Sequence, residues 1–167
     1  MKIPLAYLFF FLTINSSSFA QRVSQTESAL ASAYFLLPLS ITATAGELDF
    51  VEIILTGSNF TTSINPFSGK IFIVNGQPGR DITIGFSSSI LNNNYWVSSY
   101  GGQLGSLEFI PDVRLSNNNI VLNGDTQTLI FSSGIGELVL NVGGTIDIQS
   151  NQPTGNYEGQ FTITGAY

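Results

Sequence analysis

The residues that most often carry out catalysis are scarce in this chain of 167 residues. It has no histidine and no cysteine, which removes the commonest general base and the thiol nucleophile. Carboxylate pairs such as Glu47/Asp49 and Glu137/Asp147 could in principle serve glycoside hydrolysis, which needs two carboxyls beside a cleft. They fall at outward positions of alternating segments, and Lys70 follows a Ser-Gly turn, so we expect all of them to be solvated. We therefore predict that the protein is not an enzyme and binds no cofactor.

Oxygen ligands suited to calcium do occur in predicted turns. They are the carboxylates of Asp81, Asp112, Asp125 and Asp147 and the asparagine runs 92–94 and 117–119. The chain has no D-x-D-x-D-G loop, and asparagine is common in turns because it tolerates left-handed backbone. We predict no metal site.

A polar segment, residues 87–106, is expected to be a long surface loop and holds three aromatic residues close together. Tyr95, Trp96 and Tyr100 could make a carbohydrate or protein contact, since exposed aromatics are enriched at interfaces. The alternative, which we favour, is that Trp96 fills the core or covers its open end.

The first 20 residues are typical of a secretory signal peptide. Lys2 precedes an apolar run over residues 3–12, and small residues precede a cleavage site between Ala20 and Gln21. The apolar run is too short to span a membrane as a helix. We expect a mature chain of residues 21–167 that forms one domain and is secreted or held at the cell surface.

The charge of this mature chain limits its partners. Without Lys2, four cations face eleven carboxylates, which gives a net charge of −7. Such a surface excludes nucleic acid, which needs a basic patch, and disfavours anionic lipid. No later segment is long enough for a transmembrane helix. The partners we expect are further copies of the chain or other surface proteins.

Hydrophobic periodicity indicates an all-β domain. Apolar residues alternate with period two between Gly, Asn and Pro turns, which is typical of antiparallel sheets with one wet face. We predict eight or nine strands in an immunoglobulin-like antiparallel β-sandwich. The predicted strands include residues 29–45, 50–55, 70–74, 82–86, 107–115 with an edge or bulge at Pro111, a hairpin over 120–131 with an Asn123-Gly124 turn, 137–149 and 157–167.

Two of these strands, at the two ends of the domain, are the candidates for association with other chains. The residues we expect to form the association strands are Phe35, Leu37, Leu39, Ile41, Phe161, Ile163 and Tyr167.

The predicted strand over residues 137–149 contains the pair Gly143-Gly144. Glycine within a strand predicts a bulge or a close approach of another backbone.

Three stretches resemble a bacterial exported family known only as a domain of unknown function, number forty-four-zero-two. They are ALASAYFLLPLSITATAGELDF at 29–50, VNGQPGRDITI at 74–84 and VGGTIDIQSNQPTGNYEGQFTITGAY at 142–167. The resemblance implies an immunoglobulin-type sandwich in the style of fimbrial subunits and spore-coat-like proteins. This chain departs from pilins because its tyrosine is the last residue and it has no cysteine pair.

Three functions remain open. The first is an exported, pilin-like structural or adhesion protein that associates by β-strand addition, in which backbone pairing at an open edge provides affinity. The second is a secreted module that binds glycan or protein through residues 92–102. The third, ranked last, is a small outer-membrane β-barrel.

Overall fold

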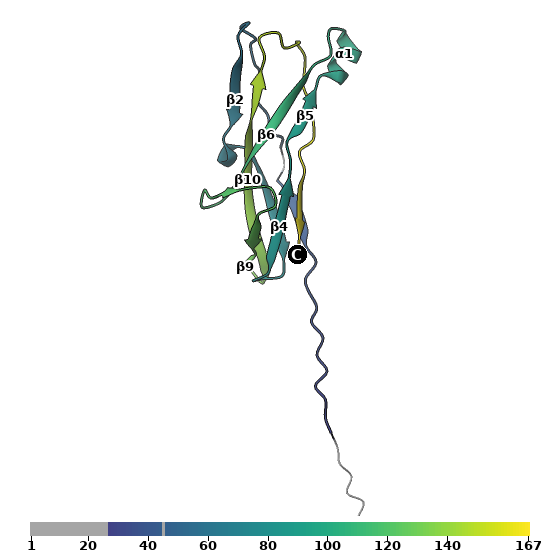
Figure 1. Ribbon diagram of the computed structural model, residues 1–167, viewed down its shortest axis with the longest axis vertical. Coiled ribbons are helices and arrows are strands. Elements are labelled where there is room, and N and C mark those ends of the chain that lie inside the picture. The colour runs from purple at the N-terminus through teal and green to yellow at the C-terminus, as the bar shows by residue number, and fades with distance from the viewer. Residues whose placement is uncertain (1–26, 45) are drawn as a thin grey trace, which may run out of the picture. The chain divides into compact units, whose positions relative to one another are not determined.

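The computed structural model describes residues 27–44 and 46–167, which fall into two units. In the unit Met1–Tyr34, the described residues 27–34 belong to no helix or strand and are exposed. The unit Phe35–Tyr167 holds all the described helices and strands (Figure 1). The predicted cleavage site at Ala20 and Gln21 lies outside the described residues. Among those that are described, no helix is long and apolar enough to cross a membrane.

Strands dominate the second unit. Its elements are β1 (Ser40–Ala43), β2 (Phe60–Ile64), the 3₁₀ helix η1 (Pro66–Ser68), β3 (Lys70–Gly76), β4 (Asp81–Phe86), β5 (Ser89–Asn92), α1 (Asn94–Tyr100), β6 (Ser106–Leu115), β7 (Ile120–Val121), β8 (Thr126–Thr128), β9 (Ile130–Ser132), β10 (Ile135–Ile148) and β11 (Ile163–Ala166).

An eight-stranded antiparallel sheet is built around β10. On one side β10 pairs with β3 and then β2, which follow each other along it with η1 between them. On the other side it pairs with β9 and then β6. β1 adds to β3, and β5 and β7 add to β6. Every strand of this sheet is therefore within two pairings of β10.

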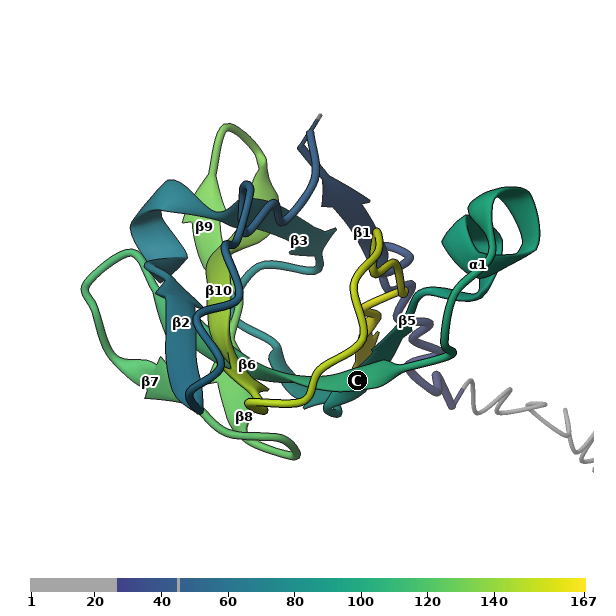
Figure 2. The same ribbon diagram turned by 90° about the horizontal axis from the view of Figure 1, so that it is seen from above.

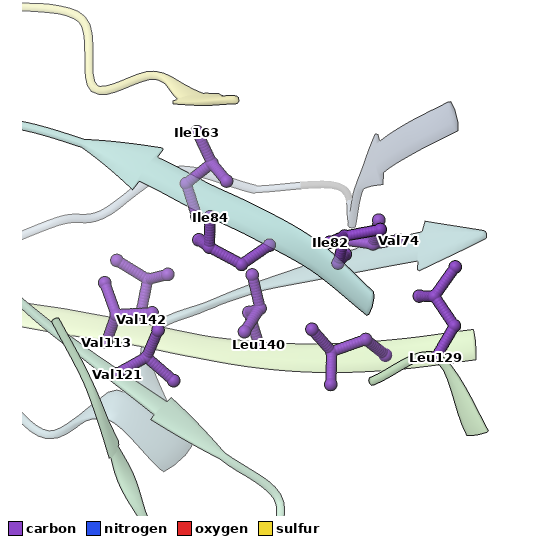
Figure 3. Close-up of a cluster of buried hydrophobic side chains, with 10 residues drawn as sticks. Val74, Ile82, Ile84, Val113, Val121, Leu129, Leu140, Val142 and Ile163 are labelled. Carbon is purple, nitrogen blue, oxygen red and sulfur yellow. The ribbon is translucent and has the colours of Figure 1, made fainter. Parts of the chain in front are cut away.

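A smaller sheet of three strands, in the order β11-β4-β8, packs against the larger one. Between the two sheets lies a core of aliphatic side chains that are at most 7% exposed. Figure 3 shows side chains of β4 and β11 meeting those of β3, β6 and β10 in this layer. The buried members are Val74, Ile82, Ile84, Val113, Val121, Leu129, Leu138, Leu140, Val142 and Ile163. The alternation predicted for β4 and β10 is thus confirmed.

A second buried cluster, formed by Leu107, Phe109, Ile146 and Ile148, is covered largely by irregular chain. Half-buried side chains of the irregular segments 48–55 and 157–161 lie over it. The strand predicted over residues 50–55 is therefore absent. Val51 has a φ of 58°, which interrupts extended backbone, and its N–H donates to the Asp49 carboxylate at 2.8 Å.

The polar segment 87–106 is not one long loop, as the sequence predicted. It contains β5 and the seven-residue helix α1, and its end begins β6. Neither element has a buried face that would repeat in the sequence, because β5 exposes Ile90 and α1 buries no residue. The periodicity that identifies buried elements is absent from these two.

The hairpin predicted over residues 120–131 is also wrong, although its turn is present. Gly124 adopts a φ of 88° after Asn123, as an Asn-Gly turn requires. However, β7 pairs with β6, β8 with β4 and β9 with β10. The Asn123 side chain accepts from Phe86 N–H at 2.8 Å, and Gly124 N–H donates to Ile84 O at 2.8 Å. The turn therefore binds β4 and carries the chain from one sheet to the other.

Two expectations about strand irregularities are confirmed. Pro111 lies between the part of β6 that pairs with β5 and the part that pairs with β7, so β6 is an edge locally, where proline is tolerated. At Gly143 a Cβ would lie 2.1 Å from Ile64 O and 2.6 Å from Pro66 N. A side chain there would keep the backbone at the start of η1 away from β10, so this is the close backbone approach expected of the glycine pair.

The all-β class is confirmed, with two antiparallel sheets in a sandwich-like arrangement (Figure 2). The described chain has eleven strands, more than the eight or nine expected, because several of them contain only two to four residues. Such short strands carry too few alternations to be recognised separately.

The core can be tested by truncating Leu140, which is fully buried on β10. Leu140→Ala should lower the free energy of unfolding by about 2–5 kcal/mol, because it removes apolar contacts and leaves a cavity. Leu122→Ala, at a residue that is 64% exposed, should change it by no more than about 0.5 kcal/mol. Urea denaturation measures both, and equal losses would contradict this packing.

Candidate functional site

The N-terminal association segment is a strand only at its end. Ile41 lies in β1 and Leu39 just before it, and both pack against the main core. Phe35 and Leu37 belong to no strand and are 87% and 41% exposed. Pro38 separates them from β1, and proline lacks the N–H that a ladder needs. The predicted strand therefore divides into a paired part and a part whose apolar side chains face solvent.

The hydroxyl of Tyr167 ties the C-terminal residue to two other segments of this unit. It donates to Leu37 O at 2.8 Å and accepts from Gln77 N–H at 2.7 Å. The Gln77 side chain in turn accepts from Leu37 N–H at 3.4 Å. Gly76 makes room for this contact, because a Cβ there would lie 2.3 Å from the hydroxyl oxygen. The last residue therefore fixes the point at which the chain enters the sandwich.

The other two residues of the predicted closing strand are core residues. Ile163 is 7% exposed and packs in the main cluster. Phe161 touches both clusters, with ring centroids 6.2 Å from Phe72, 6.2 Å from Phe86 and 5.7 Å from Phe109. Only Ile163–Ala166 forms a strand, so Phe161 lies before it in irregular chain. There its ring packs between the two clusters.

The outer side of β11 presents backbone groups that β4 does not use. Ile84 directs its N–H and C=O to the far side of β4, where they bond Asp125 and Gly124 at 2.9 and 2.8 Å. Gly165 is opposite Ile84, so its own N–H and C=O point away from β4. By the same register, the N–H and C=O of Ile163 also point away from β4. β11 ends its sheet, and no strand of the described chain pairs with this side.

The three aromatic residues of the predicted contact loop lie together on α1. Tyr95 is 74% exposed, Tyr100 73% and Trp96 38%. The Trp96 and Tyr100 rings are 4.6 Å apart, and Trp96 also lies against Gly155, where a Cβ would be 2.9 Å from its ring. Trp96 belongs to neither buried cluster, so it does not fill the core. The other placement favoured from the sequence, a cover over the open end of the core, stays a prediction. Figure 1 places α1 and β9 at opposite ends of the unit.

A residue that sequence reasoning missed holds α1 in place. Asn93 is fully buried, and its side chain donates to Gln103 O at 3.0 Å and to Thr154 O at 3.2 Å. It also accepts from Gly105 N–H at 2.7 Å. This one amide joins the two loops that flank α1. The only signal in the sequence was its place within an asparagine run, which did not distinguish it from Asn92 and Asn94.

Two of the residues considered for catalysis are held by hydrogen bonds to other groups. Asp147 accepts a hydrogen bond from the Thr61 hydroxyl at 2.5 Å, and Lys70 Nζ donates to Gly46 O. Glu137 lies on β10 opposite Asn75, ten residues before Asp147 on the same strand. Within residues 27–44 and 46–167, no three His, Cys, Asp or Glu side chains are grouped as metal ligands would be.

Comparison with known families agrees with the resemblance carried by the three motifs. The family model described as "Domain of unknown function (DUF4402)" matches residues 39–167, which is more than half of the chain. This chain belongs to the DUF4402 family. No curated protein and no solved structure matches it significantly. The DUF4402 match runs from the residue before β1 to Tyr167, so it contains all the described strands and α1.

The role of the terminal tyrosine can be tested by Tyr167→Phe, which removes only its hydroxyl. Two hydrogen bonds are lost, so the free energy of unfolding should fall by about 1–3 kcal/mol. Amide exchange at Gln77 should also become faster. Tyr95→Phe is the matched control, because that ring is largely exposed. Hydrogen–deuterium exchange that is unchanged at Gln77 would contradict the anchoring role.

Proposed function

We propose that this protein is exported and acts at the cell surface or outside the cell as a non-catalytic structural or adhesion protein of pilin-like type. It would associate with other chains by β-strand addition. One observation carries the proposal. Residues 29–37 have the alternation of a strand, yet none of them belongs to a strand, and Leu30 and Phe35 are 96% and 87% exposed.

The composition of this segment favours pairing with another backbone. Residues 28–46 contain no charged side chain, so no charge in them opposes edge-to-edge contact. Natural edge strands usually carry charge, proline or a covering element that prevents such contact. Here Pro38 blocks continuation into β1, and the backbone of Leu37 is bonded to Gln77 and Tyr167, but residues 29–36 before them remain able to pair. These residues are enough for a typical strand of about five or six.

The acceptor that fits best is the outer side of β11 in a second copy. Ile163 and Gly165 offer two N–H and two C=O groups there, and no described strand uses them. The core clusters are already closed, with buried members at most 8% exposed. We therefore propose that the segment adds alongside the sandwich and does not insert into it. Backbone pairing would supply the affinity, and alternate side chains would supply the selectivity.

Export is testable directly. Expressed with its first 20 residues in a bacterial host, the protein should be recovered outside the cytoplasm, with Gln21 as its first residue. Intact-mass measurement of the exported protein detects this cleavage. Retention in the cytoplasm as a full-length chain would contradict export. Lys2→Glu should slow processing, because the signal peptide would lose its positive charge.

Association should depend on the exposed apolar residues of segment 29–37. The exported protein should form oligomers in light scattering, and the double variant Leu30→Asp/Phe35→Asp should be monomeric, because two charges cannot pack on a sheet edge. Ile54→Asp is the matched control, since Ile54 is 78% exposed and lies outside the segment. A wild-type protein that is strictly monomeric would contradict the proposal, as would oligomers that survive the double variant.

The exposed aromatic group on α1 favours a second candidate, a module that binds glycan or protein. Aromatic side chains with a polar tip are enriched in binding interfaces. If this candidate is correct, Trp96→Ala should abolish binding on a glycan array. Ile90→Ala, an exposed apolar residue on β5, should retain it. Binding that is equal in wild type and Trp96→Ala would exclude the α1 surface.

A further inference from the structure

The outer face of the larger sheet carries a polar hollow that neither candidate function uses. Its volume is about 540 Å³, within the range of about 300–1,000 Å³ that is usual for small-ligand sites. Gly144 and Thr145 of β10 line it between two walls. One wall is η1 with its N-cap Asn65, and the other is β6 with the turn that follows it.

The β6 wall presents an arginine whose position is fixed. Arg114 Nε donates to both carboxylate oxygens of Asp112, at 3.0 and 3.1 Å, and Nη1 donates to Asn118 Oδ1 at 3.0 Å. The side-chain hydrogen bond with Asp112 raises the pKa of Arg114, so the guanidinium stays charged. Nη2 has no hydrogen-bond partner among the described residues. A held guanidinium can donate to a ligand without losing further side-chain entropy.

The η1 wall supplies an aromatic ring and an oriented amide. Asn65 Oδ1 accepts from Phe67 N–H at 2.9 Å, which leaves the amide NH₂ of Asn65 to donate. Phe67 is 50% exposed although it is a large apolar residue. Phe67 lines the same hollow as Arg114 and Asp112. A partly exposed aromatic residue thus borders a site whose other residues both donate and accept hydrogen bonds.

The η1 wall depends on Gly143 in β10. Gly143 lets the start of η1 lie against β10, since a Cβ there would meet Ile64 O and Pro66 N. The strand register places Ser63, an outward residue of β2, opposite Thr145 of β10. It also places Asp112 of β6 opposite Gly143 of β10. Hydroxyl, carboxylate and guanidinium groups from three strands therefore converge on one area.

We propose that this hollow is a binding site for a saccharide. Asp112 neutralises Arg114, so the site has no excess charge that would select a free anion. A sugar ring offers hydroxyls that both donate and accept, together with an apolar face of C–H groups. Hydroxyls match Arg114, Asp112, Ser63 and Thr145, and the C–H face matches the ring of Phe67. This inference does not depend on strand addition or on α1.

The test uses ¹⁵N-labelled protein titrated with glucose, galactose, mannose, N-acetylglucosamine, N-acetylgalactosamine and N-acetylneuraminic acid, each alone and as short oligosaccharides. At least one probe should shift the amide signals of Phe67, Asn118 and Thr145 in a saturable way. Arg114→Met should weaken that binding by about tenfold or more, since a hydrogen-bonded charged donor is lost.

Phe67→Ala is the second variant, because its ring is half-exposed on a short turn and its loss should leave the fold intact. It should weaken binding with an amide spectrum that is otherwise unchanged. Asp81→Asn is the matched control, a carboxylate bonded to Thr128 on the smaller sheet, and should bind as wild type does. The proposal is overturned if no probe shifts these three amides, if the shifts fall on α1 instead, or if Phe67→Ala binds unchanged.

Discussion

Backbone pairing along β10 holds the larger sheet together, since β2, β3, β6 and β9 all hydrogen-bond to it. Its inward side chains also supply both cores, with Leu138, Leu140 and Val142 in one and Ile146 and Ile148 in the other. The change from one core to the other occurs at Gly143-Gly144, and Gly143 lets the start of η1 lie against β10. The residue that admits η1 to the sheet thus also makes space for the polar hollow on its outer face.

Sequence reasoning succeeded where burial repeats with period two. The faces of β4 and β10 and the all-β class follow directly from that alternation. It failed where a residue's partner is distant in sequence. The Asn123-Gly124 turn has the signature of a local hairpin, but its hydrogen bonds go to β4. Segment 50–55 is apolar enough for a strand, but Val51 at a φ of 58° interrupts it. Nothing local in the sequence reports either fact.

The candidate site shows the same division. The sequence identified the exposed aromatics of α1, the apolar N-terminal segment and Tyr167. It did not identify Asn93, because a buried amide that joins two loops resembles any turn asparagine. Nor did it identify the Arg114–Asp112 pair, whose neighbours Phe67 and Thr145 come from segments more than 30 residues away in either direction. Only the antiparallel register around β10 brings these residues together.

The central claim is that residues 29–36 pair with the outer side of β11 in another copy, and disulfide cross-linking tests it most directly. The chain has no cysteine, so any disulfide must form between introduced residues. Single-cysteine variants at each of residues 30–36 are mixed in turn with Thr164→Cys, and with Ser98→Cys on α1 as control. We expect the yield of heterodimers with Thr164→Cys to rise and fall with a period of two along residues 30–36, since alternate side chains face opposite sides of a strand. Equal cross-linking at every position, or as much with Ser98→Cys, would contradict the claim.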